Sequence, residues 1–114
     1  MLRYGFPRSE RVTKKTDFEK VFTQGRILQD GLMTMRLRPN RLTVTRLGII
    51  VSKRTLKKAV DRNRVKRLIR ESFRQTKNDL PKGFDILVSL KWTQDTKREH
   101  IKQSFLNLFS SLHA

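Results

Sequence analysis

Apolar residues recur along the chain at the two spacings that mark helices and strands. Three stretches follow the helical spacing of i, i+3, i+4 and i+7, so that one face of each is mainly apolar. These faces consist of Phe18, Val21 and Phe22; of Val65, Leu68, Ile69, Ser72 and Phe73; and of Ile101, Phe105, Leu108, Phe109 and Leu112. The pattern predicts a short first helix, a long middle helix and a closing helix.

Boundary signals accompany these helices. Thr16 with Glu19, and Thr96 with Glu99, have the form of capping boxes at the starts of the first and the last helix. Gly25 supplies a stop signal behind the first helix. We therefore expect the first helix to begin at Thr16 and to end before Gly25.

Two other stretches alternate as half-buried strands do. Residues 32–38 and 84–90 each direct every second side chain to one face. The first of these stretches has Met33, Met35 and Leu37 on one face and Thr34, Arg36 and Arg38 on the other. A third stretch, residues 47–51, is apolar on both faces, which is typical of a central strand.

The order of these elements indicates one layered domain. Helix, strands, helix, strand and helix follow one another without a repeat or a linker, so we expect a single α+β domain, residues 1–114, in which helices cover a small sheet. Residues 1–13 are basic and irregular, and they are interpreted as an extended arm.

The charge balance adds a requirement for a partner. The chain contains 27 Lys and Arg against 10 Asp and Glu, a formal net charge of +17, whereas small domains usually carry roughly 2–8. So many like charges repel one another unless a polyanion neutralises them, which predicts a nucleic acid, with an anionic membrane as the alternative. The longest wholly apolar run, residues 48–51, is far too short to span a membrane. Neither basic helix pairs its cations with exposed Trp or Leu, so no membrane partner is expected.

Two absences bear on the compartment. The chain has no cysteine, which excludes a disulfide framework and a thiolate metal site. Residues 1–8 are interrupted by Arg, Gly and Pro and contain no apolar signal core. The expected localisation is cytoplasmic.

The side chains do not predict a protein active site. His100 and His113 lie in the region of the last helix, away from any carboxylate pair with metal-ligand spacing, and are interpreted as surface residues. The acidic residues are scattered, unlike the clustered Asp and Glu that hold two metal ions for phosphodiester cleavage. No serine is paired as a nucleophile would be, and no Gly-rich phosphate loop occurs. We expect no catalytic residue, no metal site and no bound cofactor in this chain.

Cations are concentrated between Lys53 and Arg74. This stretch contains ten Lys or Arg against only Asp61 and Glu71. A basic face that is merely solvated would not explain why acids are so nearly excluded. The stretch is therefore the predicted contact surface for a polyanion.

The helical spacing places these cations on one side of the middle helix. At about 100° per residue, Lys66, Arg70 and Arg74 form one row opposite the apolar face. The residues beside this row or at its margins are Arg62, Asn63, Arg64 and Arg67. Guanidinium groups bind phosphate oxygens in a bidentate manner, and an Asn amide can donate to and accept from a base edge or a sugar. We therefore expect this helix to bind RNA.

The residues around this helix resemble a known family. The chain is similar to the signature of the bacterial ribonuclease P protein component at residues 51–54 and 59–70, which read Val51-Ser52-Lys53-Arg54 and Ala59-Val60-Asp61-Arg62-Asn63-Arg64-Val65-Lys66-Arg67-Leu68-Ile69-Arg70. Residues 16–22, 46–49 and 83–86 resemble the first helix, the central strand and the last strand of that family. With the apolar closing helix, the resemblance covers nearly the whole chain.

The resemblance implies a reaction that an RNA carries out. In that family a large RNA subunit is the catalyst, and it removes the 5′ leader from precursor tRNA with the Mg²⁺ that the RNA–protein holoenzyme requires. The protein subunit binds the catalytic RNA and the leader. The chain would then be part of an endoribonuclease of tRNA 5′ maturation, with its catalytic centre in the RNA subunit and no DNA partner.

The resemblance also implies site residues. The expected RNA-binding residues are Lys53, Arg54, Arg62, Asn63, Arg64, Lys66, Arg67, Arg70 and Arg74. A leader cleft between the first helix and the sheet carries over to Phe18 and Phe22, for which core packing is the alternative role. Members of the family often present a further aromatic residue where this chain has Arg36, and a cation–π or phosphate contact could replace it.

The family fold is a two-layer α/β sandwich of four strands and three helices. Its order is α-β-β-β-α-β-α, and it contains a left-handed strand-helix-strand crossover. The residue pattern alone indicates only three strands, and ordinary crossovers are right-handed, so the topology follows from the resemblance. Two other functions stay open: a ribosomal or ribosome-assembly RNA-binding protein, and a protein-only nuclease, against which the missing carboxylate cluster argues.

Overall fold

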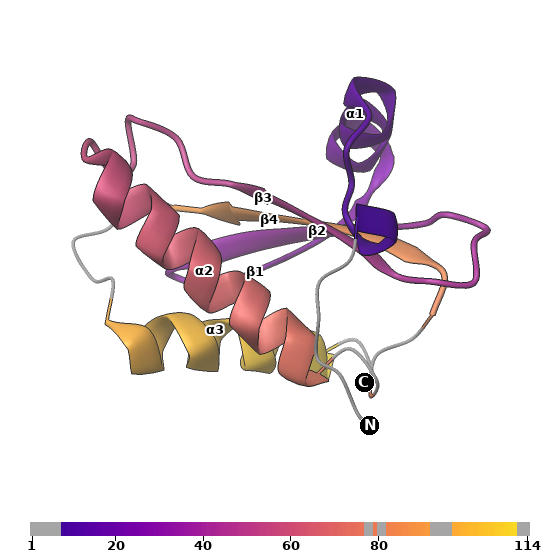
Figure 1. Cartoon of the computed structure of the whole chain (residues 1–114). Helices are drawn as coiled ribbons and strands as arrows, with labels where there is room; N and C mark the ends of the chain where they lie inside the picture. The colour runs from indigo at the N-terminus through magenta and orange to yellow at the C-terminus, as the bar shows by residue number, and fades with distance from the viewer. Residues whose placement is uncertain (1–7, 77–78, 80–81, 92–96, 112–114) are drawn as a thin grey trace.

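The computed structural model describes residues 8–76, 79, 82–91 and 97–111. Its elements (Figure 1) are η1 (Arg8–Glu10, a 3-10 turn), α1 (Lys15–Gln24), β1 (Arg26–Gln29), β2 (Met33–Pro39), β3 (Arg46–Ile50), α2 (Ala59–Thr76), β4 (Phe84–Leu90) and α3 (Arg98–Ser110). The expected α+β architecture and the order α-β-β-β-α-β-α are confirmed. No helix in the described part of the chain is long and apolar enough to cross a membrane.

The sheet has four strands in the order β1-β2-β4-β3. β2 pairs antiparallel with both β1 and β4, whereas β3 pairs parallel with β4. Two parallel neighbours cannot be joined by a tight turn, and here the connection runs through α2. This is the expected crossover unit; its left-handed sense stays a prediction.

β1 is the strand that the residue pattern did not indicate. Gly25 ends α1 as expected, with its N–H donating to the carbonyl of Val21 at 2.9 Å, but the chain enters β1 at the very next residue. The strand is only four residues long and has Ile27 and Leu28 side by side, so it shows no alternation. It is recognised only through its pairing with β2.

The expected central position of residues 47–51 is wrong, because β3 lies at an edge of the sheet. In the described residues, the outer edge of β3 pairs only with Arg11, through an isolated parallel bridge to Leu47. Both faces of the strand are nevertheless covered, since Leu47 lies in the core and Gly48 lies against the ring of Phe18 on the other side. Coverage by neighbouring elements explains the two apolar faces of this edge strand.

One face of the sheet carries the core, and α2 and α3 cover it (Figure 1). The alternation expected for residues 32–38 is confirmed, since Met33, Met35 and Leu37 are buried and the residues between them are partly exposed. The helices contribute Val65, Leu68, Ile69, Phe73, Ile101, Phe105, Leu108 and Phe109 to this core. Leu112, the last residue of the expected face, lies outside the described residues. Burying one such large side chain stabilises the fold by about 1.5–3 kcal/mol.

The opposite face of the sheet is covered in part, by α1 (Figure 1). The register aligns Ile27, Arg36, Leu87 and Gly48 in one row across the four strands. A Cβ atom on Gly48 would lie 2.8 Å from Cε1 of Phe18, so the glycine is what allows this ring to rest on the sheet. The absence of a side chain on β3 therefore sets the position of α1.

Neither α1 nor α3 begins with a side-chain cap. α1 begins at Lys15 behind Lys14, without a side-chain cap, so Thr16 already lies within the first turn. Thr96 lies outside the described residues, and α3 begins at Arg98 behind Lys97, again without a side-chain cap. Packing against the sheet and the core, rather than side-chain caps, stabilises these helix starts.

The described part of the basic arm, residues 8–13, lies on the sheet. Its first residues form the η1 turn, and Arg11 then pairs with Leu47 of β3. The N–H of Val12 donates to the carbonyl of Leu47 at 3.0 Å, and the Val12 side chain is buried. The arm therefore ends as a short extension of the sheet beside β3.

Candidate nucleic-acid interface

The basic helix of the sequence is α2, and its apolar face is buried as expected. Val65, Ile69 and Phe73 are fully buried against the sheet and α3. On the side toward β3, Lys66 and Arg70 line a cavity of about 620 Å³. We call this cavity the α2–β3 groove; its lining residues are Arg11, Val12, Thr13, Phe18, Leu47, Gly48, Ile49, Lys66, Arg67, Arg70, Glu71 and Arg74.

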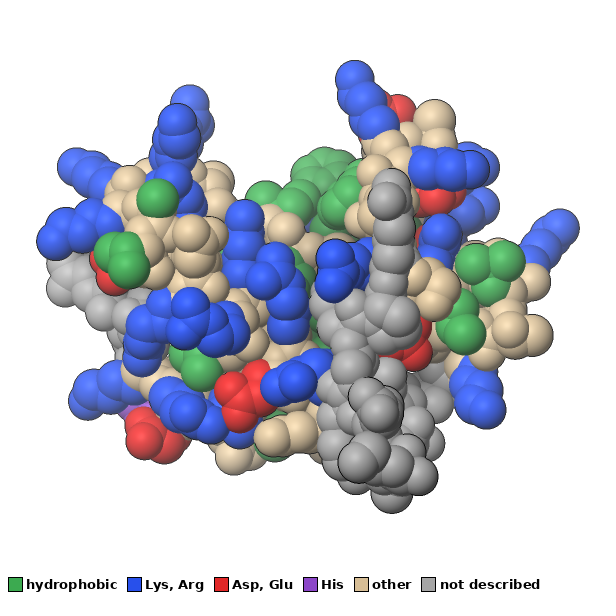
Figure 2. Space-filling view, viewed as in Figure 1, with side chains coloured by type: hydrophobic (Ala, Val, Ile, Leu, Met, Phe, Trp, Pro, Cys, Tyr) green, Lys and Arg blue, Asp and Glu red, His purple; other side chains and the backbone are tan. Residues whose placement is uncertain are grey.

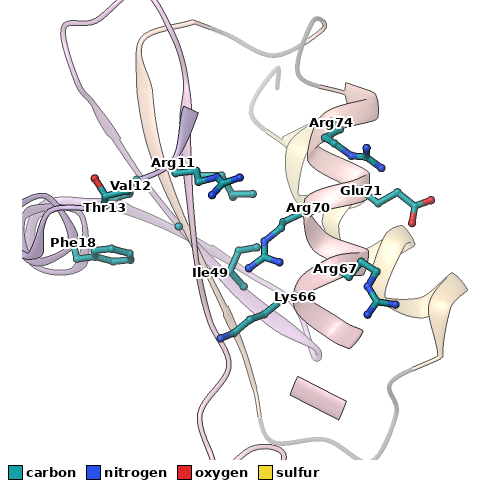
Figure 3. Close-up of a pocket in the computed structure, with 12 residues that line it drawn as sticks. Arg11, Val12, Thr13, Phe18, Ile49, Lys66, Arg67, Arg70, Glu71 and Arg74 are labelled. Atoms are coloured by element: carbon teal, nitrogen blue, oxygen red, sulfur yellow. The ribbon is translucent and has the colours of Figure 1, made fainter. Parts of the chain in front are cut away.

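Cations enter this groove from two sides (Figure 3). Lys66 and Arg70 extend from α2 toward β3, while Arg11 extends toward α2 from the segment beside β3. β3 forms the floor, and the ring of Phe18 lies at the end nearest α1. Five Lys or Arg side chains against one Glu in the lining make the groove a site for anionic groups.

The single acid in this lining, Glu71, is already paired. Its carboxylate accepts a hydrogen bond from Arg98 at 2.8 Å and one from Lys102 at 3.4 Å, both on α3. These contacts tie α2 to α3 on the side away from the sheet, and they offset the negative charge of Glu71. The groove therefore keeps an excess of positive charge.

The expected RNA-binding residues fall into two clusters. Lys66, Arg67, Arg70 and Arg74 line the α2–β3 groove. Lys53 and Arg54 are exposed on the segment before α2, which we call the cationic loop (residues 52–58), and Asn63 and Arg64 are exposed on the first turns of the helix. Figure 2 shows Lys and Arg side chains gathered over this loop and α2, and again over α1, with a hollow between the two groups.

Arg62 differs from the other members of this set. Its side chain is half-buried, and Nη1 donates to the carbonyls of Leu56 at 2.9 Å and Lys57 at 2.8 Å. It thus contacts the backbone of the cationic loop and does not line the groove. The residue pattern contained no signal for this role.

Phe18 and Phe22, the pair expected in one cleft, have different surroundings. Phe18 is half-buried against Gly48 and lines the α2–β3 groove. Phe22 is 53% exposed and lies outside that lining. The guanidinium of Arg36 lies 4.3 Å from the centre of the Phe22 ring, a cation–π contact within the chain. The contact of Arg36 with the leader stays a prediction.

Arg36 also has an unsatisfied hydrogen-bond donor. Its Nε is buried and has no hydrogen-bond partner within the described residues. An unsatisfied buried donor costs about 1–3 kcal/mol. Phe22 and Arg36 place an exposed ring and a positive charge side by side on the open sheet face.

A charged network anchors α1 above the sheet. Arg46 on β3 donates to both carboxylate oxygens of Asp85 on β4, at 2.7 and 2.6 Å, and lies 3.4 Å from Asp17 on α1. The hydrogen bonds to Asp85 raise the pKa of the Arg46 guanidinium, despite the opposing effect of its burial. Asn40 donates to the same carboxylate at 2.9 Å. Sequence reasoning missed this network because its members lie far apart along the chain.

Arg11 is a further site residue that sequence reasoning missed. Residues 1–13 were interpreted only as a basic arm, yet Arg11 faces α2 across the groove (Figure 3). The available signal was Val12, an apolar residue among charged and polar neighbours, which indicates a segment that packs against the domain.

Carboxylate and imidazole groups are dispersed over the described residues. They include no group of three or more His, Cys, Asp or Glu that could hold a metal ion.

Comparison with known proteins decides the family. The family model described as Ribonuclease P matches residues 6–113. The chain belongs to the ribonuclease P protein family. Membership makes it a protein component of a tRNA-processing endoribonuclease.

Individual ribonuclease P proteins support this assignment over different lengths. The chain is 38% identical to the ribonuclease P protein component of Thermotoga maritima over 112 residues, which cover 94% of this chain and 95% of that protein. It is 49% identical to the component of Methylococcus capsulatus over 71 residues, 62% of this chain and 56% of that protein. A solved structure of a Staphylococcus aureus RNase P protein, a mutant described as defective in mRNA degradation activity, has a TM-score of 0.86 at 28% identity and covers 93% of this chain and 90% of that one.

Proposed function

We propose that the chain is the RNA-binding subunit of a bacterial ribonuclease P holoenzyme, with two contact surfaces. The α2–β3 groove and the cationic loop would bind the catalytic RNA. The open sheet face beside Phe22 and Arg36 would bind the 5′ leader of precursor tRNA. The observation that carries the proposal is the groove itself, in which five cations from two segments surround a cavity of about 620 Å³ in a family member.

The groove suits a nucleic-acid backbone for an electrostatic reason. The backbone that carries its cations is held in place, because α2 packs on the core and Arg11 is paired with β3. Phosphate groups placed there release their counterions and relieve the repulsion among Lys66, Arg70 and Arg74. Binding of RNA would therefore stabilise the protein as well as the complex.

The leader surface rests on the exposed ring of Phe22. Base stacking on an aromatic side chain contributes roughly 1–3 kcal/mol per base and tolerates every base, as a surface for varied leaders requires. Arg36 supplies a positive charge at the same place, 4.3 Å from the centre of the ring. A stacked base and its phosphate would share this pair.

Catalysis would remain with the RNA subunit. The dispersed carboxylates of the described residues do not fit a Mg²⁺ site on this chain. The protein would act by holding the catalytic RNA and the substrate together while lowering the repulsion between them.

Precursor-tRNA cleavage tests the proposed function. The chain is added to the ribonuclease P RNA of the same organism at a Mg²⁺ concentration that limits the RNA alone, and release of the leader is measured. The chain should lower the Mg²⁺ concentration needed for cleavage. An unchanged requirement would refute the proposal, and ribosomal RNA as the main RNA that copurifies would favour a ribosomal or ribosome-assembly protein.

A substitution of Phe22 tests the leader surface separately. Phe22→Ala should weaken the binding of a substrate with a long leader by roughly tenfold, as expected for one lost stacking contact, and leave a substrate with a one-nucleotide leader unaffected. Phe22→Tyr keeps the ring and should bind both substrates as the parent does. Equal losses for the two substrates in Phe22→Ala would place the leader elsewhere.

A further inference from the structure

The cationic loop has an ordered backbone. The N–H groups of Thr55 and Leu56 both donate to the carbonyl of Ser52 at 3.1 Å. The Ser52 and Thr55 hydroxyls are 3.0 Å apart, and the Thr55 N–H lies 3.2 Å from the Ser52 hydroxyl. The loop therefore folds as a closed turn at the end of β3.

This turn presents four cations to solvent. Lys53, Arg54, Lys57 and Lys58 are all exposed, and none of them forms an ion pair within the described part of the chain. Four like charges within six residues repel one another, so an open chain would spread them apart. A force other than charge pairing must hold the turn closed.

In addition to the hydrogen bonds to Ser52, Arg62 holds the loop from the first turns of α2. Its Nη1 donates to the carbonyls of Leu56 and Lys57, and its own N–H donates to the carbonyl of Lys58 at 3.1 Å. Three successive carbonyls of the loop are thus bound to one residue. A hydrogen bond from a charged donor is stronger than one from a neutral donor, which suits this task.

We propose that Arg62 is a positioning residue: it holds the cationic loop so that Lys53, Arg54, Lys57 and Lys58 meet the phosphates of the partner RNA together. The inference rests on the proposed function, because the partner is the RNA bound there. A preorganised backbone lowers the entropy lost when long side chains are immobilised on binding. Arg62 therefore acts on RNA mainly through the loop, whereas Arg67 and Arg70 meet phosphate with their own side chains.

Amide hydrogen exchange in the free protein tests the first part. Arg62→Ala should speed exchange at Thr55 and Leu56 by about tenfold, because the turn loses two carbonyl contacts. Arg67→Ala is the matched control: it removes an exposed guanidinium from the same helix and should leave exchange at both amides unchanged. Unchanged exchange in Arg62→Ala overturns the proposal.

A double-mutant cycle with the catalytic RNA tests the second part. Arg62→Ala should weaken binding by at least tenfold in the parent, and by less than threefold once Lys57 and Lys58 are already replaced by Ala. Arg67→Ala should weaken binding equally in both backgrounds. Equal losses for Arg62→Ala in the two backgrounds overturn the proposal and indicate direct phosphate contact. A parent chain that fails to bind the RNA refutes the proposed function instead. The result of the hydrogen-exchange experiment would still stand, because that experiment contains no RNA.

Discussion

At the scale of single residues, Gly48 positions an aromatic ring by having no side chain. Cε1 and Cζ of Phe18 would lie 2.8 and 3.1 Å from a Cβ placed on Gly48, and Cδ1 of Leu87 would lie 3.2 Å away. Because Phe18 connects α1 to the end of the α2–β3 groove, this contact couples the position of α1 to the shape of the groove.

Gly48→Ala should therefore destabilise the fold and displace Phe18. The expected loss in the free energy of unfolding is about 1–3 kcal/mol, the usual cost of overpacking, as measured by urea denaturation. Gly31→Ala is the control, since a Cβ there would meet nothing within 4 Å. If the two variants are equally stable, Phe18 does not depend on Gly48.

Asp30 makes stability depend on pH. Burial alone would raise the pKa of its carboxyl, but the hydrogen bonds from the Ser104 hydroxyl and from the N–H groups of Met33 and Leu32 outweigh burial and lower it below the ordinary value of 3.8. A pKa lowered in the folded state means that the stabilisation is present above pH 3.8 and is lost as the pH falls through the folded pKa.

Asp30→Asn should accordingly reduce the acid sensitivity of the fold. At pH 7 the variant should have a lower free energy of unfolding than the parent. This difference should be smaller at pH 3, because the carboxylate of the parent begins to be protonated there. Glu19→Gln, an exposed position on α1, serves as the control for loss of one acid. A deficit that stays the same at both pH values would contradict the assigned role of Asp30.

At the scale of elements, α2 combines a core face with a cationic face. Its buried residues fix the helix on the sheet, so Lys66 and Arg70 project into the groove from a rigid support. This arrangement separates stability from binding: changes on the outer face should alter affinity for RNA and leave the fold intact.

The salt dependence of RNA binding measures this face. Lys66→Ala and Arg70→Ala should each lower the slope of log affinity against log salt by roughly one unit, the value expected for one lost phosphate contact. Gln75→Ala, at an exposed neutral position of the same helix, should leave the slope unchanged. Slopes that match the parent in both Lys66→Ala and Arg70→Ala would mean that the groove contacts no phosphate.

At the scale of the whole molecule, charge opposes folding. A net charge of +17 on 114 residues weakens the compact state until anions neutralise it. The groove concentrates part of this charge in the folded state only, because it brings Arg11 beside α2, a segment that is distant in the unfolded chain. Anions should therefore bind the native protein better than the unfolded one.

Sulfate should consequently raise the melting temperature of the free chain. Binding at about 100 times the dissociation constant stabilises a folded protein by about 2.7 kcal/mol, which corresponds to several degrees for a domain of this size. The comparison is made against sodium chloride at equal ionic strength, which screens charge without multivalent binding. Equal melting temperatures in the two salts would count against clustered anion sites.

Local patterns were sufficient for most of the elements. The three helices, the alternation of β2 and the strand β4 follow from the spacing of apolar residues, because burial of one face imposes a period of 3.6 or 2 on neighbouring residues. β1 could not be predicted in this way, since its four residues belong to the sheet only through their partners in β2. The edge position of β3 was missed because Phe18 and the core cover an edge strand here as fully as a central one.

The sequence by itself determined the family and predicted the partner class: the excess of Lys and Arg and the Arg62-Asn63-Arg64 motif are properties of composition and of adjacent residues. Only the tertiary structure decided how these residues are used. It brought Arg11 opposite Lys66 and Arg70, placed Phe18 in the groove and Phe22 under Arg36, and directed Arg62 to the cationic loop. The physical reason is that a cavity, a cation–π pair and a hydrogen bond to a loop carbonyl each depend on the distance between groups, which local sequence patterns do not specify.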